Sequence, residues 1–173
     1  MFDFDRDTIL SVKETLDEAR ERGLMIATAE SCTGGLLAAA LTAVAGSSTV
    51  FERGFITYSN AAKQELLGVA GETLAAHGAV SEQTAREMAE GALHHSAADI
   101  AVAITGIAGP GGGSEEKPVG LVCFACAARD GETMALVKQF GDIGRADVRY
   151  QAMLTALDLL RLQMEENYPP AVT

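Results

Sequence analysis

The sequence predicts a three-layer α/β/α fold on a mixed sheet, and three features support this. Helical and strand-like segments alternate through most of the chain, which is typical of parallel strands covered by helices. Two later strand-like segments, 119–128 and 133–140, are joined by a short Asp-Gly turn and predict an antiparallel hairpin. The chain has 173 residues, of which 48% are apolar, so it can build one sizeable core. We therefore expect a single domain over residues 1–173.

The individual elements follow from local patterns along the chain. Apolar residues at helical spacing predict a first helix over 7–22, which ends at Gly23. An apolar run over 24–29 predicts a buried strand, and a turn with two glycines leads from it into an alanine- and leucine-rich helix over 36–44. Further along we expect a strand over 51–59, a helix to Leu67 capped by Asn60, a loop over 69–80, a helix from Ser81 to Leu93, a buried strand over 100–105 and a last helix over 145–164.

Charge and hydropathy argue against two classes of partner. The formal net charge is -11, and no cluster of basic residues is present to displace counterions from a phosphate backbone, so we expect no nucleic-acid partner. No apolar run approaches the roughly 20 residues that cross a bilayer. The acidic segment 1–6 is also unlike a signal peptide. We therefore expect a cytoplasmic protein with no membrane partner.

The pattern of cysteines indicates reduced thiols buried in the core. Cys123 and Cys126 have the spacing of a zinc or redox pair, but they lie in an apolar, strand-like run without a matching second pair, and Cys32 makes their number odd. The chain has no His-Glu-x-x-His motif, and the adjacent His94 and His95 fit solvated residues at a helix end. We expect neither a metal site nor a cofactor.

Ser31 is the first candidate catalytic residue, because it follows a buried strand and precedes a helix. The first turn of a helix has free N–H groups that can bind an oxyanion, so this position suits a nucleophile. From the flanking residues alone, a simple helix cap is the favoured role of this serine. Cys32 is the alternative nucleophile, but a cysteine enzyme usually needs a histidine partner, and no histidine is an obvious one.

Without a histidine, a serine amidase must take its base from a lysine or a tyrosine, and Lys63 and Tyr58 are the candidates. To act as a base, a lysine needs a pKa about 3 units below its ordinary value. The helix dipole contributes at most ~1 kcal/mol, which lowers the pKa by less than one unit. Burial would have to supply most of the shift. From their positions alone, Lys63 also fits a surface lysine and Tyr58 a residue at the edge of the core.

Two further features suit an anionic substrate. The glycine-rich loop from Gly106 to Ser114 offers backbone N–H groups, although it matches neither a Walker A motif nor a Rossmann fingerprint. Arg145 and Arg149 share one face at the start of the last helix, where cations are unfavourable unless an anion lies nearby. That anion is either a carboxylate, of Asp142 or Asp147, or a substrate phosphate.

Several strings of residues, spread in order over nearly the whole chain, form a specific pattern although each alone is weak. They are 28–35 (Thr-Ala-Glu-Ser-Cys-Thr-Gly-Gly), 45–48, 51–54, 57–60 with Lys63, 77–81, 105–110 and 113–120. Together they closely resemble the C-terminal domain of the CinA competence-damage family.

The resemblance implies an α/β fold with a mixed, mostly parallel five-stranded sheet. It also implies hydrolysis of the carboxamide of nicotinamide mononucleotide to nicotinate mononucleotide and ammonia, in pyridine-nucleotide salvage. In that reaction Ser31 is the nucleophile, and Lys63 and Tyr58 assist it. The residues expected to bind substrate are Thr33, Gly34, Gly35, Ser48, Thr105, Gly106 and Arg145.

Two other classes of function stay open on the sequence. One is a non-catalytic nucleotide-binding domain with a regulatory role in competence or DNA damage. The other is an amidase for a different small amide, which would not require the phosphate. Whichever function applies, we expect the protein to form a homo-oligomer, a dimer or higher.

Overall fold

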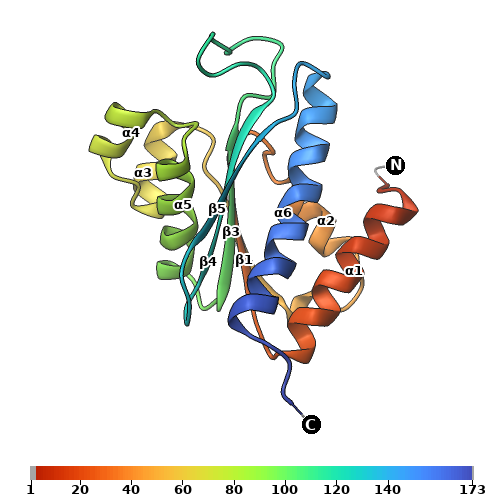
Figure 1. The fold of residues 1–173 in the computed structure, drawn as a ribbon. Coiled ribbons are helices and arrows are strands. Elements are labelled where there is room, and N and C mark those ends of the chain that lie inside the picture. The colour runs from red at the N-terminus through yellow and green to blue at the C-terminus, as the bar shows by residue number, and fades with distance from the viewer. Residues whose placement is uncertain (1–2, 173) are drawn as a thin grey trace.

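The computed structural model describes residues 3–172, and residues 1, 2 and 173 lie outside the described part, including the start of the acidic N-terminal segment. At its centre is a five-stranded sheet with the order β2-β1-β3-β4-β5 (Figure 1). The strands are β1 (Ile26–Glu30), β2 (Phe51–Ile56), β3 (Ile100–Gly106), β4 (Leu121–Ala128) and β5 (Met134–Gln139).

The sheet is mixed, as expected. Strand β1 is parallel to both of its neighbours, β2 and β3, whereas β4 is antiparallel to both β3 and β5. All strands except β4 therefore point the same way, but only half of the neighbouring pairs are parallel. The expectation of a mostly parallel sheet holds for strand direction and is wrong for pairing, because the hairpin of β4 and β5 places a reversed strand beside β3.

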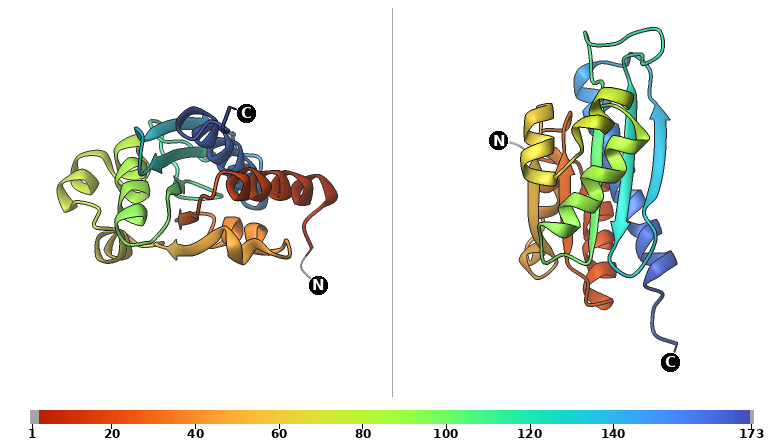
Figure 2. Two further views of the ribbon diagram at one scale, coloured as in Figure 1. Left: turned by 90° about the horizontal axis from the view of Figure 1, so that it is seen from below. Right: turned by 90° about the vertical axis from the view of Figure 1, so that its left-hand side faces the viewer.

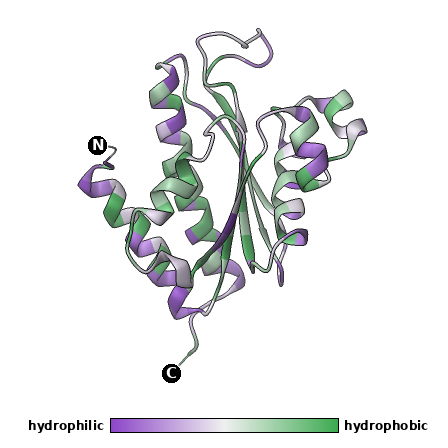
Figure 3. Cartoon of the chain, turned by 180° about the vertical axis from the view of Figure 1, so that it is seen from behind, coloured by the Kyte–Doolittle hydropathy of each residue, from purple (hydrophilic) through white to green (hydrophobic). Residues whose placement is uncertain are grey.

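Helices cover both faces of this sheet and form the predicted three layers (Figures 1 and 2). One outer layer contains α1 (Arg6–Glu21), α2 (Leu36–Thr42) and α6 (Arg145–Asn167). The other contains α3 (Asn60–Leu67), α4 (Gly71–His77) and α5 (Glu82–His94). The hydrophilic residues of these helices lie mainly on their outward faces (Figure 3).

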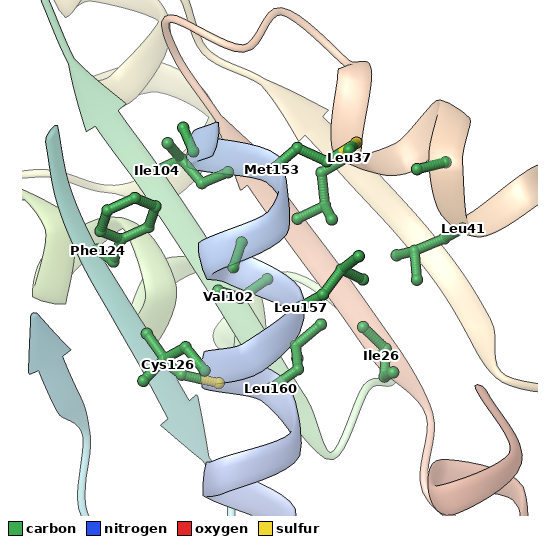
Figure 4. Packing of buried hydrophobic residues seen from close by; sticks show 14 of the residues in the cluster. Ile26, Leu37, Leu41, Val102, Ile104, Phe124, Cys126, Met153, Leu157 and Leu160 are labelled. Carbon is green, nitrogen blue, oxygen red and sulfur yellow. The ribbon is translucent and has the colours of Figure 1, made fainter. Parts of the chain in front are cut away.

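The core consists of two clusters, one on each face of the sheet. On β3, Val102 and Ile104 belong to the cluster that packs against α6 (Figure 4). Ala101 and Ala103, between them, belong to the cluster under α5. This alternation is the two-residue period of a strand that is buried on both faces. The bulky side chains fill the α6 side, and the alanines leave room for α5 to lie close to the sheet.

The same alternation shows whether Cys123 and Cys126 of β4 can act as a pair. Cys123 belongs to the cluster under α5 and Cys126 to the cluster under α6, so their side chains lie on opposite faces of the sheet. They cannot bind one metal ion or pair with each other. Both are buried free thiols, as predicted.

Two local expectations are wrong. Helix α3 is capped by Ser59, whose Oγ accepts a hydrogen bond from the Ala62 N–H at 3.0 Å, and Asn60 is its first helical residue. The expected loop over 69–80 contains α4, which has no buried residue and therefore lacks the apolar stripe that would have predicted it. In residues 3–172, no helix combines the length and apolar character needed to cross a membrane.

The parallel strands bring distant segments to one edge of the sheet. Glu30, at the carboxyl end of β1, is in register with Ile56 of β2 and Ile104 of β3. The residues that follow these three strands therefore meet, and polar groups from three parts of the chain share one site.

Candidate active site

A cleft at this edge of the sheet brings Ser31, Tyr58 and Lys63 together and has a volume of about 260 Å³. The rest of its lining consists of Cys32, Ala79, Val80, Arg145 and, from the glycine-rich loop, Thr105, Gly106, Ile107, Ala108, Gly109, Gly111 and Gly112.

Lys63 is buried at the base of this cleft, with only 1% of its surface exposed. Its Nζ lies 2.8 Å from the hydroxyl oxygen of Ser31. The same nitrogen donates hydrogen bonds to the main-chain carbonyls of Thr57, at 2.8 Å, and Tyr58, at 3.1 Å. Helix α3 begins immediately after these two carbonyls, and Lys63 reaches back to them from its first turn.

The three contacts of Lys63 can be made by an ammonium group, which donates to all three oxygens, or by a neutral amine. A neutral amine has two N–H groups and one lone pair, and the two carbonyls can take both N–H groups. In that neutral form, the lone pair can accept the hydroxyl proton of Ser31, whose oxygen lies 2.8 Å away. No carboxylate in the described part of the chain forms an ion pair with Lys63 that would favour the charged form.

The electrostatic surroundings also favour the neutral amine. Burial lowers the pKa of Lys63 below the ordinary lysine value, and the nearby Cys32 opposes this shift to a smaller extent. A lowered pKa is what a lysine base requires. Burial is the main cause, as the sequence argument required.

Cys32, the alternative nucleophile, stays protonated at neutral pH. Burial raises the pKa of the Cys32 thiol to about 11. Since the thiolate is the reactive form of cysteine, Cys32 is a poor nucleophile at neutral pH. The site therefore favours the neighbouring serine, whose hydroxyl contacts the amine of Lys63.

Ser31 lies at the start of a tight turn, residues 31–35, which we call the Ser31 turn. Gly34 and Gly35 in this turn have φ angles of 58° and 100°, in the left-handed region that favours glycine. The Ser31 N–H donates to the carbonyl of Ile104 in β3 at 2.9 Å. This bond attaches the turn directly to the edge of the sheet.

Glu30, which precedes the Ser31 turn, occupies the N-terminus of α2. Its carboxylate is buried and accepts hydrogen bonds from the N–H groups of Leu37, at 2.9 Å, and Ala38, at 3.1 Å. The Leu36 N–H donates to the Thr33 carbonyl. The expectation that N–H groups at the helix start bind an oxyanion is therefore wrong. Sequence reasoning missed Glu30, although an acidic residue at the end of an apolar strand was a signal.

Arg149 holds the Ser31 turn from the side of α6. Its Nε donates to the Cys32 carbonyl at 3.1 Å, and its Nη2 donates to the Thr33 carbonyl at 2.9 Å. The N–H groups of Cys32 and Thr33 donate to no other residue in the described chain. They are the N–H groups closest in sequence to Ser31 that no other residue occupies.

Tyr58 contributes its carbonyl to Lys63 and points its side chain elsewhere. Its side chain is largely exposed, and its hydroxyl accepts a hydrogen bond from Arg145 Nη2 at 3.0 Å. Arg145 Nη1 donates to the Gly109 carbonyl at 2.8 Å. Within the described chain, Arg145 forms no ion pair with Asp142 or Asp147, the alternative that the sequence left open.

The model of the CinA C-terminal domain matches residues 10–164. This chain belongs to the CinA C-terminal domain family. Nicotinamide-nucleotide amidohydrolase PncC of Enterobacter agglomerans is 56% identical over 149 residues, which cover 86% of this chain and 90% of that protein. The protein of the same name from Escherichia coli strain K12 is 53% identical over 161 residues, 92% of this chain and 96% of its own length.

Solved structures support the same family fold. The crystal structure of the competence/damage inducible protein CihA from Agrobacterium tumefaciens has a TM-score of 0.91 and 53% sequence identity. The match covers 94% of this CinA domain and 98% of that chain.

Of the other residues that the sequence predicted at the site of this CinA domain, some line the cleft and others do not. Thr105 is buried, and its hydroxyl donates to the Ala79 carbonyl at 2.8 Å beside Gly106 in the cleft wall. Thr33, Gly34 and Gly35 are the part of the Ser31 turn that does not line the cleft. Ser48 is not brought to this site, since it lies in the short 3-10 helix Ser47–Thr49 before the amino end of β2. Ala79 and Val80 also line the cleft; they belong to the string 77–81 that carries the family resemblance, but sequence reasoning assigned them no role at the site.

A larger hollow of about 760 Å³ lies beside the cleft, where the tip of the glycine-rich loop faces the end of β5. The two hollows share Gly111 and Gly112. The charged residues lining the larger one are Glu115 and Asp142, with no lysine or arginine. An anionic substrate is better served by the smaller cleft, which contains Arg145 and the reactive groups.

Proposed function

We propose that this protein hydrolyses the carboxamide of nicotinamide mononucleotide to nicotinate mononucleotide and ammonia, with Ser31 as nucleophile and Lys63 as base. The names of the two relatives support the substrate. The observation that carries the chemistry is the 2.8 Å contact between the buried Lys63 Nζ and the Ser31 hydroxyl. A serine is a weak nucleophile until a base removes its proton, and here the base already contacts it.

In the first half of the reaction, Ser31 Oγ attacks the carboxamide carbon while Lys63 takes the hydroxyl proton. The tetrahedral intermediate then breaks its C–N bond, and the proton held by Lys63 passes to the departing nitrogen, which leaves as ammonia. An ester between Ser31 and the nicotinate carbonyl remains. In the second half, Lys63 takes a proton from water, the resulting hydroxide attacks the ester, and Ser31 recovers its proton as the carboxylic acid leaves.

The negative charge on the intermediate requires hydrogen-bond donors near Ser31. The N–H groups at the start of α2 are occupied by Glu30 and by the Thr33 carbonyl. We therefore assign this task to the free N–H groups of Cys32 and Thr33, because the residue after a serine nucleophile commonly supplies such a donor.

Arg145 is our candidate for binding the substrate phosphate. It lies in the cleft lining, it carries no ion pair in the described chain, and its present partners are the neutral Tyr58 hydroxyl and Gly109 carbonyl. A guanidinium can exchange a neutral partner for a phosphate at little cost, because charge-assisted bonds are stronger. In this arrangement Tyr58 orients Arg145 at the cleft mouth, and its carbonyl orients Lys63.

We place the reaction in the cytoplasm, where the free thiols of Cys32, Cys123 and Cys126 stay reduced. The expected homo-oligomer stays a prediction, for which light scattering of the purified protein is the direct measurement.

Ammonia release tests this proposal directly. The purified protein is incubated with nicotinamide mononucleotide, nicotinamide riboside or free nicotinamide, and Ser31→Ala serves as the matched control. We expect release from the mononucleotide, weaker release from the riboside and none with the variant. Binding of the mononucleotide without ammonia release would favour the regulatory alternative. Preference for free nicotinamide would favour an amidase of different specificity.

A further inference from the structure

Arg149 is a charged residue at the site that the mechanism does not use directly. It lies one helical turn after Arg145 on α6 but does not line the cleft. In the described chain it forms no ion pair, although it is partly buried. Its guanidinium donates hydrogen bonds to the main-chain carbonyls of Cys32 and Thr33, which lie more than a hundred residues away in the sequence.

We propose that Arg149 is a positioning residue that fixes the Ser31 turn in its reactive geometry. The inference rests on the proposed function, because it assumes that Ser31 is the nucleophile. A peptide group is planar, so a bond that fixes the Cys32 carbonyl also fixes the Thr33 N–H on the opposite side of the same plane. Arg149 therefore sets the direction of one of the two N–H groups assigned to the oxyanion.

The charge of Arg149 adds to this effect of geometry. A cation at a carbonyl oxygen polarises the peptide group and makes its N–H a stronger donor. The guanidinium of Arg149 bonds to carbonyls of the protein itself, so its field is present before the negative charge develops on the substrate. Preorganised donors of this kind act mainly on the transition state.

The Ser31 turn has few other attachments that could replace Arg149. On the sheet side, the Ser31 N–H is bonded to Ile104. Within the turn, the Gly34 N–H donates to the Ser31 carbonyl at 3.1 Å. The Cys32 carbonyl has Arg149 as its side-chain partner, and the Thr33 carbonyl shares Arg149 with the Leu36 N–H. Without the guanidinium, the peptide between Cys32 and Thr33 loses its fixed direction.

The two arginines of α6 therefore have separable roles. Arg145 faces the cleft and is positioned to contact substrate, whereas Arg149 faces the back of the Ser31 turn. Loss of Arg145 should weaken substrate binding, and loss of Arg149 should slow the chemical step. The distinction is visible as a change in KM in the first case and in kcat in the second.

The test compares Arg149→Met and Arg149→Lys with wild type and with Arg161→Met. Arg161 lies on the same helix and pairs with Glu14 and Glu18, so its variant loses an α6 arginine far from the site. Steady-state kinetics of ammonia release from nicotinamide mononucleotide, melting temperatures and the pH dependence of kcat are measured for all four proteins.

We expect Arg149→Met to lower kcat about 10- to 100-fold, because displacement of a reacting group by about 1 Å costs about 100-fold. KM should stay close to the wild-type value, since Arg145 keeps its contacts. The pH range over which activity rises should also be unchanged, since Lys63 keeps its contacts. Arg149→Lys keeps the charge and should retain intermediate activity. It also provides the test if Arg149→Met fails to fold.

Three results would overturn the inference. A raised KM with unchanged kcat would make Arg149 a substrate-binding residue. Unchanged kinetics in both Arg149 variants would show that the Ser31 turn holds its geometry without the guanidinium. An equal loss of kcat and melting temperature in Arg161→Met would show general destabilisation of α6. Failure of the proposed function is distinguishable from all three, since it appears as undiminished activity in Ser31→Ala or as no ammonia release by wild type.

Discussion

The amine of Lys63 lies 2.8 Å from the hydroxyl of Ser31, although the two residues are 32 positions apart in the sequence. The contact is buried and is flanked by two carbonyls that accept the remaining protons of the amine. A lysine in this setting can exist without its charge, and a serine beside it can lose a proton. This one contact is the basis of the first two predictions.

Ser31→Ala should abolish deamidation, with a loss on the order of 10⁴-fold or more, as for other serine hydrolases that lose their nucleophile. Cys32→Ala should retain most of the activity, because the Cys32 thiol stays protonated with a pKa of about 11. Ammonia release by the two variants measures the difference. Equal losses in both would remove Ser31 from its assigned role.

Lys63→Arg should be inactive, since a guanidinium stays protonated and cannot accept the proton of Ser31. In the wild type, only the neutral amine is active, so kcat/KM should rise with pH through the folded-state pKa of Lys63. That pKa is lowered by burial, so the rise should be complete at a lower pH than an ordinary lysine would allow. A pH profile of ammonia release checks both points. Activity that falls as the pH increases through this range would contradict a lysine base.

Arg145→Ala should raise KM for nicotinamide mononucleotide with little change in kcat. Loss of a charge-assisted hydrogen bond of ~1.5 to 3 kcal/mol weakens binding roughly 10- to 150-fold. The riboside lacks the phosphate and should be nearly indifferent to the change. Kinetics on both substrates decide the matter, and equal small effects on both would exclude Arg145 from phosphate binding.

Glu30→Ala should destabilise the protein by about 1 to 3 kcal/mol, because the buried N–H of Leu37 and the partly buried N–H of Ala38 lose their acceptor. Urea unfolding followed by circular dichroism measures the free energy of unfolding. Glu82→Ala is the matched control, since Glu82 forms an exposed pair with Arg86 and its loss should cost less than about 1 kcal/mol. If both variants lost the same stability, the cap formed by Glu30 would be energetically unimportant.

The sequence predicted most elements of the fold because their signals are local. The helical period of α1, the apolar run of β3 and the Asp-Gly turn between β4 and β5 each depend on a few neighbouring residues. Helix α4 was missed because none of its residues is buried, and a helix without an apolar stripe has no periodic signal.

The sequence alone also determined the family, through strings of residues in a fixed order, and it named Ser31, Lys63 and Arg145 as candidates. Position along the chain could not show whether Lys63 is buried or exposed, because burial depends on what packs around it. Nor could it show that Glu30 fills the start of α2, or that Ser48 lies away from the cleft.

Only the tertiary structure decided these points, because each depends on contacts between segments far apart in the sequence. The parallel pairing of β1 with β2 and β3 carries the Ser31 turn, Tyr58 and Thr105 to one edge of the sheet. Helix α6 then adds Arg145 and Arg149 from the end of the chain. The sequence supplied the chemical groups, and the packing of the three layers determined their burial, their partners and the direction in which each one points.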